Sequence, residues 1–133
     1  MSKIVTLSEA ASIALHSMVL IAKSESKLNV NQISEAIESS KHHVAKVMQR
    51  LAKEEFVSSN RGPSGGFVIK RDPATLTLLE IYEAIEGRVS IQSCPGDKRT
   101  CIIGSCMLGD LSKNMTREFK TYMESHYLSE YIK

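Results

Sequence analysis

Three cysteines lie close together in a sequence that has no others. Cys94, Cys101 and Cys106 fall within the stretch 94-CPGDKRTCIIGSC-106 of the 133-residue chain. Thiolates gathered in this way can ligate an iron–sulfur cluster, and without metal they can form disulfides or be nitrosylated. The neighbouring Lys98 and Arg99 favour the thiolate form that all of these reactions need. Structural zinc sites usually use more closely spaced cysteine pairs, so zinc is a weaker interpretation.

The composition indicates one globular domain, because 42% of the residues are hydrophobic and 24% are charged. The most apolar stretch, residues 12–22, is too short to span a bilayer. Glu9 interrupts any apolar region after Lys3, which argues against a signal peptide. An odd number of cysteines without a secretory signal is typical of a reducing compartment. We therefore expect a cytoplasmic protein with no membrane segment.

The charge distribution indicates a polyanionic partner for the first half of the chain. Residues 39–71 carry seven basic and two acidic side chains, a local net charge of 7 − 2 = +5. Residues 72–133 carry seven basic and nine acidic side chains, a net charge of 7 − 9 = −2. A surface helix with a solvated basic face would give the same pattern, so the charge supports DNA binding only together with the fold.

The first three predicted elements are helices. Thr6 and Glu9 form a capping-box signature for a helix that runs to about residue 22. A short second helix begins near Asn29 or Asn31, and Ser40 is the predicted N-cap of a third helix over about residues 41–54. One face of the third helix is apolar, and the other shows His42, His43, Lys46, Gln49, Arg50 and Lys53. Two short helices, a polar turn and a basic second helix are typical of a helix-turn-helix.

The stretch that follows predicts a β-hairpin. Two β-prone runs, residues 56–60 and 67–70, flank the turn 61-RGPSGG-66. A hairpin directly after a helix-turn-helix is a wing, so the fold class is mainly α, a winged helix-turn-helix with a two-stranded wing. The residues expected to bind DNA are Ser40, Lys41, His42, His43, Lys46, Arg50, Arg61, Gly62 and Pro63.

Two more helices are predicted after the wing. Thr75 or Thr77 caps a helix that ends at Gly87, and a long last helix runs over about residues 107–127. The last helix carries an apolar stripe that either packs within the chain or forms a dimer, made of Leu108, Leu111, Met115, Phe119, Tyr122 and Met123. The chain thus divides into a DNA-binding domain (1–87), a cysteine-bearing sensor loop (88–106) and a dimerisation helix with a C-terminal tail (107–133).

These residues resemble a known family. The wing sequence RGPSGGF and the following DPATLTLLEIYEAIEG are similar to the bacterial winged helix-turn-helix regulators typified by the iron–sulfur regulator IscR and the nitric-oxide-responsive repressor NsrR. The resemblance extends over nearly the whole chain. It implies a homodimeric regulator, most often a repressor, that binds palindromic promoter DNA, with the long last helix as the dimerisation element.

The resemblance also implies a role for the cysteines. Sensor members of the family hold a 2Fe–2S or 4Fe–4S cluster with three cysteines in this position, here Cys94, Cys101 and Cys106, although the middle cysteine is shifted by one position. A fourth ligand comes in some relatives from the partner's first helix, where His16 of this sequence aligns. For His16 the competing interpretation is a core histidine with a satisfied hydrogen bond.

Other positions are weaker candidates for the fourth ligand. The acidic ligand of some relatives aligns with Ser12, a poor ligand, and the histidine of others aligns with Gly109. Glu9 is an outside candidate, and His126 is expected to be only a polar residue.

Three rival functions remain. The first is a cluster-free regulator that senses through thiol oxidation or nitrosylation, and the second is a regulator that senses by protein contact. The third is an enzyme, but the sequence has neither CxxC nor a cysteine–histidine–acid arrangement, so we expect no enzymatic activity.

Overall fold

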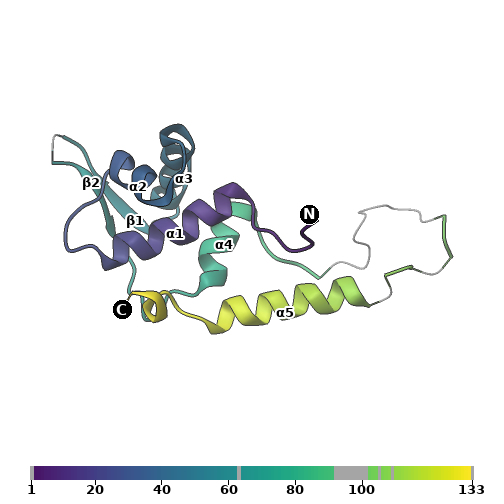
Figure 1. The fold of residues 1–133 in the computed structure, drawn as a ribbon. Coiled ribbons are helices and arrows are strands. Elements are labelled where there is room, and N and C mark those ends of the chain that lie inside the picture. Colours follow the sequence, from purple (N-terminus) through teal and green to yellow (C-terminus); the bar gives the residue numbers. More distant parts are fainter. Residues whose placement is uncertain (1, 63, 92–101, 105, 109, 133) are drawn as a thin grey trace.

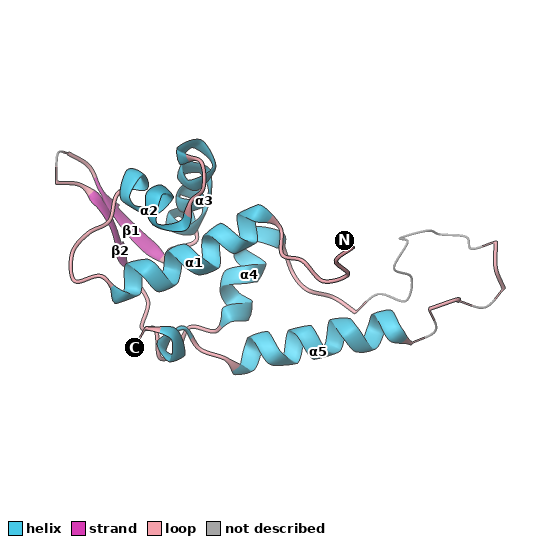
Figure 2. Ribbon diagram, viewed as in Figure 1, coloured by secondary structure: helices cyan, strands magenta, loops and turns pink. Residues whose placement is uncertain are grey.

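The computed structural model describes residues 2–62, 64–91, 102–104, 106–108 and 110–132, and it has the predicted fold class. The described elements are α1 (Glu9–Lys23), α2 (Val30–Ile37), α3 (Lys41–Lys53), β1 (Val57–Asn60), β2 (Gly66–Ile69), α4 (Leu78–Glu86), α5 (Leu111–Ser125) and a short 3₁₀ turn, η1 (Leu128–Tyr131). Figure 1 shows α1 to α4 and the hairpin gathered into one body, from which α5 extends. The elements are mostly helical (Figure 2).

The helix-turn-helix is formed by α2 and α3, and its caps agree with the sequence. Asn29 caps α2 in a full capping box, since its side chain accepts from Gln32 N and Gln32 in turn accepts from Asn29 N. Ser40 caps α3 by accepting a hydrogen bond from His43 N at 3.1 Å. Glu38, in the turn between the helices, adopts a left-handed backbone with φ +56°.

The prediction for the start of α1 was wrong. The N-cap is Ser8 and not Thr6, because the Ser8 hydroxyl accepts from Ala11 N at 3.0 Å. Glu9 is therefore the first residue of the helix, where a carboxylate is favourably placed near the helix N-terminus. Its side chain points to α3 instead of back to a capping partner.

One hydrophobic core joins α1, α3, the wing and the end of the chain. Its largest fully buried side chains come from elements far apart in the sequence: Ile13, Met18, Ile33, Met48, Leu51, Leu76, Ile81 and Leu128. The predicted apolar face of α3 is buried as expected, with Val44, Val47, Met48 and Leu51 all inside. The basic face of the same helix is therefore left at the surface.

The wing is anchored by a third segment that the sequence did not indicate. The two strands pair antiparallel, with Asn60 opposite Gly66 and Val57 opposite Ile69. Leu28, just before α2, pairs with the outer side of β2, since Phe67 N donates to Leu28 O at 2.8 Å and Leu28 N to Phe67 O at 3.3 Å. This pairing fixes the wing to the helix-turn-helix.

The C-terminal end of the chain returns to the core. Leu78 N donates to His126 O at 3.0 Å, and Leu128 N donates to Leu76 O at 2.8 Å. Tyr82 of α4 meets the ring of Phe119 edge to face, with centroids 5.0 Å apart. Burial, followed by the nearby Glu86 carboxylate, raises the pKa of Tyr82 above its ordinary value, so the phenol stays neutral.

The last helix is shorter than predicted. It begins at Leu111, after Asp110 in a non-helical conformation, and it ends at Ser125. His126 is extended because the following residue, Tyr127, forms a β-bridge with Thr77, and this tertiary pairing ends the helix. Among the helices of the described residues, none is long and apolar enough to cross a membrane.

Candidate nucleic-acid interface and sensor site

The exposed face of α3 and its N-cap present most of the predicted DNA-binding residues. Ser40, Lys41, His42, Lys46 and Arg50 are all exposed, on the face opposite the core. The cap hydrogen bond of Ser40 leaves the first amide N–H groups of α3 pointing out of the helix, where they can bind a phosphate. The geometry thus brings five of the predicted residues onto one surface.

His43 differs from its neighbours because it is paired within the protein. Its Nδ1 lies 3.1 Å from Glu9 Oε1 of α1, and its side chain is only 33% exposed. The pairing ties the first turn of the recognition helix to the first turn of α1. Sequence reasoning missed it, since the Thr6–Glu9 capping pattern explained Glu9 without a tertiary partner.

The wing places Arg61 at an exposed tip. Gly62 adopts φ +108°, a conformation that favours glycine, and Gly65 N donates to Gly62 O at 2.9 Å to close the turn. Arg61 and Gly62 are therefore presented together at the end of the hairpin. Pro63, also predicted to contact DNA, lies outside the described residues.

Two basic residues that contribute to the local charge stabilise the end of α3. The Arg71 guanidinium lies 4.0 Å from the centre of the Phe56 ring, and its Nη2 donates to Glu54 O at 2.9 Å. Lys70 Nζ is 3.1 Å from Glu55 Oε1. The basic side chains of this segment that remain for a polyanion therefore lie along the whole exposed face of α3 and at the wing tip.

The predicted metal ligands are only partly covered by the structure. Cys94 and Cys101 lie outside the described residues, and Cys106 is an exposed free thiol. Within the described part of the chain, no three His, Cys, Asp or Glu side chains are grouped so as to hold a metal ion.

His16 is exposed on α1, so it is not the core histidine of the competing interpretation. Its Nδ1 lies 2.7 Å from the backbone oxygen of Ser12. A carbonyl oxygen only accepts, so Nδ1 carries a proton in this contact, and in a neutral imidazole of this tautomer Nε2 holds the lone pair. A hydrogen bond from Nδ1 fixes the orientation of the ring and favours the tautomer in which Nε2 can bind a metal.

An open groove of about 890 Å³ lies between α1 and α5. His16 lies among its apolar lining residues, which include Leu15 and Val19 of α1 and Met115, Phe119 and Tyr122 of α5. The predicted stripe of the last helix is mostly uncovered here, since Leu111 is 54% and Tyr122 53% exposed, and only Met123 is buried. Packing against the described residues therefore covers only part of this stripe.

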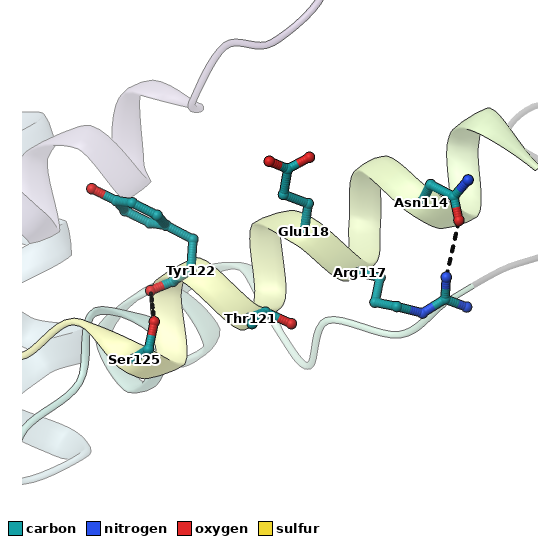
Figure 3. Close-up of a pocket in the computed structure, with 6 residues that line it drawn as sticks. All are labelled: Asn114, Arg117, Glu118, Thr121, Tyr122 and Ser125. Atoms are coloured by element: carbon teal, nitrogen blue, oxygen red, sulfur yellow. Dashed lines mark hydrogen bonds between the residues drawn. The ribbon is translucent and has the colours of Figure 1, made fainter.

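A second hollow runs along α5 and is lined by residues with polar groups (Figure 3). Arg117 Nη1 donates to Asn114 Oδ1 at 3.0 Å, and Ser125 Oγ donates to Tyr122 O at 3.0 Å. All six lining residues come from this one helix, and their hydrogen bonds are local. The hollow is therefore a polar helix surface beside the apolar groove.

Known proteins resemble this chain along most of its length. The model of the Rrf2 family, described as an iron-dependent transcriptional regulator, matches residues 7–133. The regulator IscR of Xenorhabdus nematophila is 30% identical over 122 residues, which is 91% of this chain and 70% of that protein. NsrR of Bacillus subtilis is 27% identical over 107 residues, 79% of this chain and 73% of that protein.

The solved structure of CymR, the global cysteine regulator of B. subtilis, matches with a TM-score of 0.76 at 20% identity over 97% of both chains. That likeness shows the fold, and the sequence relatives are transcription regulators and not enzymes. With a helix-turn-helix, a wing and this family match, the chain belongs to the Rrf2 family of DNA-binding transcription regulators.

Proposed function

We propose that the chain is a homodimeric transcription repressor whose affinity for promoter DNA is set by an iron–sulfur cluster bound to Cys94, Cys101 and Cys106. The observation that carries the proposal is the exposed His16 beside the apolar groove, whose Nδ1 contacts the Ser12 carbonyl, so that Nε2 is the nitrogen that would act as the ligand. Three thiolates and one imidazole form a complete donor set for a 2Fe–2S or 4Fe–4S cluster.

The DNA-binding part of the proposal uses the surface of α3 and the wing. The first turn of α3 enters the major groove, where Lys41 and His42 reach base edges. Lys46 and Arg50 lie one and two turns further along and bind backbone phosphates. The wing tip with Arg61, Gly62 and Pro63 approaches the adjacent minor groove.

The dimer uses the apolar groove and the uncovered face of α5. Exposed side chains that line it or continue it include Val5, Leu7, Leu111, Met115, Tyr122 and Tyr131. A contiguous apolar surface of this kind marks an interaction site, and a second copy places two recognition helices on a palindromic site. The three proposed parts are the DNA-binding domain (1–87), the sensor loop (88–106) and the dimerisation helix with the C-terminal tail (107–133).

Dimerisation can be measured directly by sedimentation equilibrium. We expect Met115→Asp to give monomers, since a carboxylate in the groove is not solvated on association. Thr121→Asp, on the polar side of the same helix, should remain dimeric. Equal association of both variants would remove the groove from the interface.

In the cluster part of the proposal, His16 of one protomer completes the site of its partner. The cluster supplies a centre that reacts with oxidants or nitric oxide. Residues of the chain prepare the ligands. The Ser12 carbonyl orients the His16 imidazole, and the basic residues of the loop favour the thiolate form of the cysteines. A change in the loop then shifts the spacing of the two recognition helices.

The deciding experiment is anaerobic purification with a visible spectrum and iron and sulfide analysis. We expect a coloured protein, loss of iron in each Cys→Ser variant, and weaker cluster retention in His16→Ala. His126→Ala is the matched control, because His126 Nδ1 also lies 2.7 Å from a backbone oxygen, that of Tyr122. A colourless protein whose DNA affinity still responds to thiol oxidation or nitrosylation would favour the cluster-free alternative.

The sign of regulation and the compartment follow from the same proposal. A dimer that covers a promoter site blocks transcription, and promoter DNA places the protein in the cytoplasm. A reporter gene behind the bound promoter tests the sign: deletion of the regulator should raise its expression, and a fall would make the protein an activator.

A further inference from the structure

The first turn of α1 makes two tertiary contacts in opposite directions. On one side, Glu9 Oε1 lies 3.1 Å from His43 Nδ1 in the first turn of the recognition helix. On the other side, the Ser8 hydroxyl donates to the carboxylate of Glu86 in the last turn of α4. Two adjacent residues therefore touch the DNA-reading helix and the helix that precedes the cysteine segment.

The last turn of α4 is also hydrogen-bonded to the residues that lead toward the cysteines. Val89 N donates to Glu83 Oε2 at 2.7 Å, and Gly87 N donates to Glu83 O at 2.9 Å. Gly87 has φ +89°, which turns the chain out of the helix. The chain that continues toward the cysteines is thus hydrogen-bonded to this turn through Val89.

The Ser8 hydroxyl connects the two contacts chemically. It has one proton, which it donates to Glu86, while its oxygen accepts from Ala11 N and caps α1. A shift of Glu86 must break this bond or rotate the hydroxyl away from its capping position. Either change disturbs the turn in which Glu9 stands.

We propose that Ser8 and Glu9 link the cysteine segment to the recognition helix, with Glu9 acting on DNA binding by positioning His43. The inference rests on the proposed function only for the signal that enters at the cysteines. The link itself consists of exposed contacts, since the Glu9 side chain is 64% exposed. Contacts of this kind have small energies, so the link should change the response about 2- to 5-fold and not abolish it.

The first test needs neither cluster nor DNA. Histidine side chains are labelled with ¹³C, and the His43 signal is assigned with His43→Gln. We expect Glu86→Ala to shift the His43 signal in the same direction as Glu9→Ala, although residue 86 does not touch residue 43. Glu25→Ala, which removes the same charge from an exposed loop position, is the control and should leave the signal in place. A His43 signal unchanged by Glu86→Ala would overturn the link.

The second test measures the ratio of DNA affinities with the cysteine segment in its two states, cluster-loaded and cluster-free. Glu9→Ala and Glu86→Ala should each reduce the wild-type ratio about 2- to 5-fold, and Glu25→Ala should not. An unreduced ratio in both variants would overturn the link. If the wild type binds DNA with equal affinity in the cluster-loaded and cluster-free states, the proposed function fails. The His43 signal of the first test still decides whether the link exists.

Discussion

Replacing Gly66 with alanine should damage the attachment of the wing. A Cβ at this position would lie 2.9 Å from both the carbonyl carbon and the oxygen of Leu28, and 3.1 Å from its nitrogen. These are backbone atoms that cannot rotate away, so either Leu28 or strand β2 must move. The movement breaks the two hydrogen bonds that join Leu28 and Phe67.

The expected magnitude follows from those contacts. Two backbone hydrogen bonds contribute about 1 kcal/mol each to stability, and overpacking adds about 1 kcal/mol or more if the strand stays in place. The free energy of unfolding should therefore fall by about 2–4 kcal/mol. A displaced wing would also move Arg61 from its proposed position at the DNA, so DNA affinity should fall as well.

Urea unfolding followed by circular dichroism gives the stability, and fluorescence anisotropy gives the DNA affinity. Gly104→Ala is the matched control, because a Cβ there meets no atom of the described residues within 4 Å. It should change the unfolding free energy by less than about 0.5 kcal/mol. If Gly66→Ala and Gly104→Ala had the same stability, the close approach of Leu28 to the wing would not be a constraint on this fold.

Three further changes test other features. Ser17 is fully buried, and among the described residues its hydroxyl has no hydrogen-bond partner. Ser17→Ala should therefore raise the free energy of unfolding by about 1 kcal/mol in urea melts, and a lower free energy of unfolding would mean that the hydroxyl is hydrogen-bonded. Glu38 has a left-handed φ of +56°. Glu38→Gly should raise the free energy of unfolding of the protein by about 0.5–1 kcal/mol, and a decrease in the same melts would contradict a strained turn. Arg61→Ala should weaken DNA binding and reduce the slope of log K against log[salt] by about 1, which a salt titration measures, and an unchanged slope would remove the wing tip from the phosphate contacts.

Local signals in the sequence predicted most of the fold. Ser40 caps α3 as expected, and Asn29 is the cap of α2 out of the two predicted candidates, because a cap depends on a hydrogen bond within three residues. The basic face of α3 followed from helical periodicity in the same way. The winged helix-turn-helix is therefore readable from short-range patterns and their order.

The errors arise where distant parts of the chain meet. Thr6 and Glu9 match a capping box, but Glu9 pairs with His43, and the cap passes to Ser8. The last helix stops at Ser125 because Tyr127 pairs with Thr77, fifty positions earlier in the chain. Neither partner could be identified without the tertiary fold. The exposure of His16 likewise became clear only once α1 was packed.

The burial of Leu128 has a consequence for how the protein is made. This side chain is fully buried in the same core as Ile13 and Ile81, and its backbone is held by Leu76. During synthesis, the nascent chain cannot close that core until residue 128 has left the ribosome. A product that stops before residue 128 lacks this core side chain, and it is expected to be unstable and to be recognised by proteases.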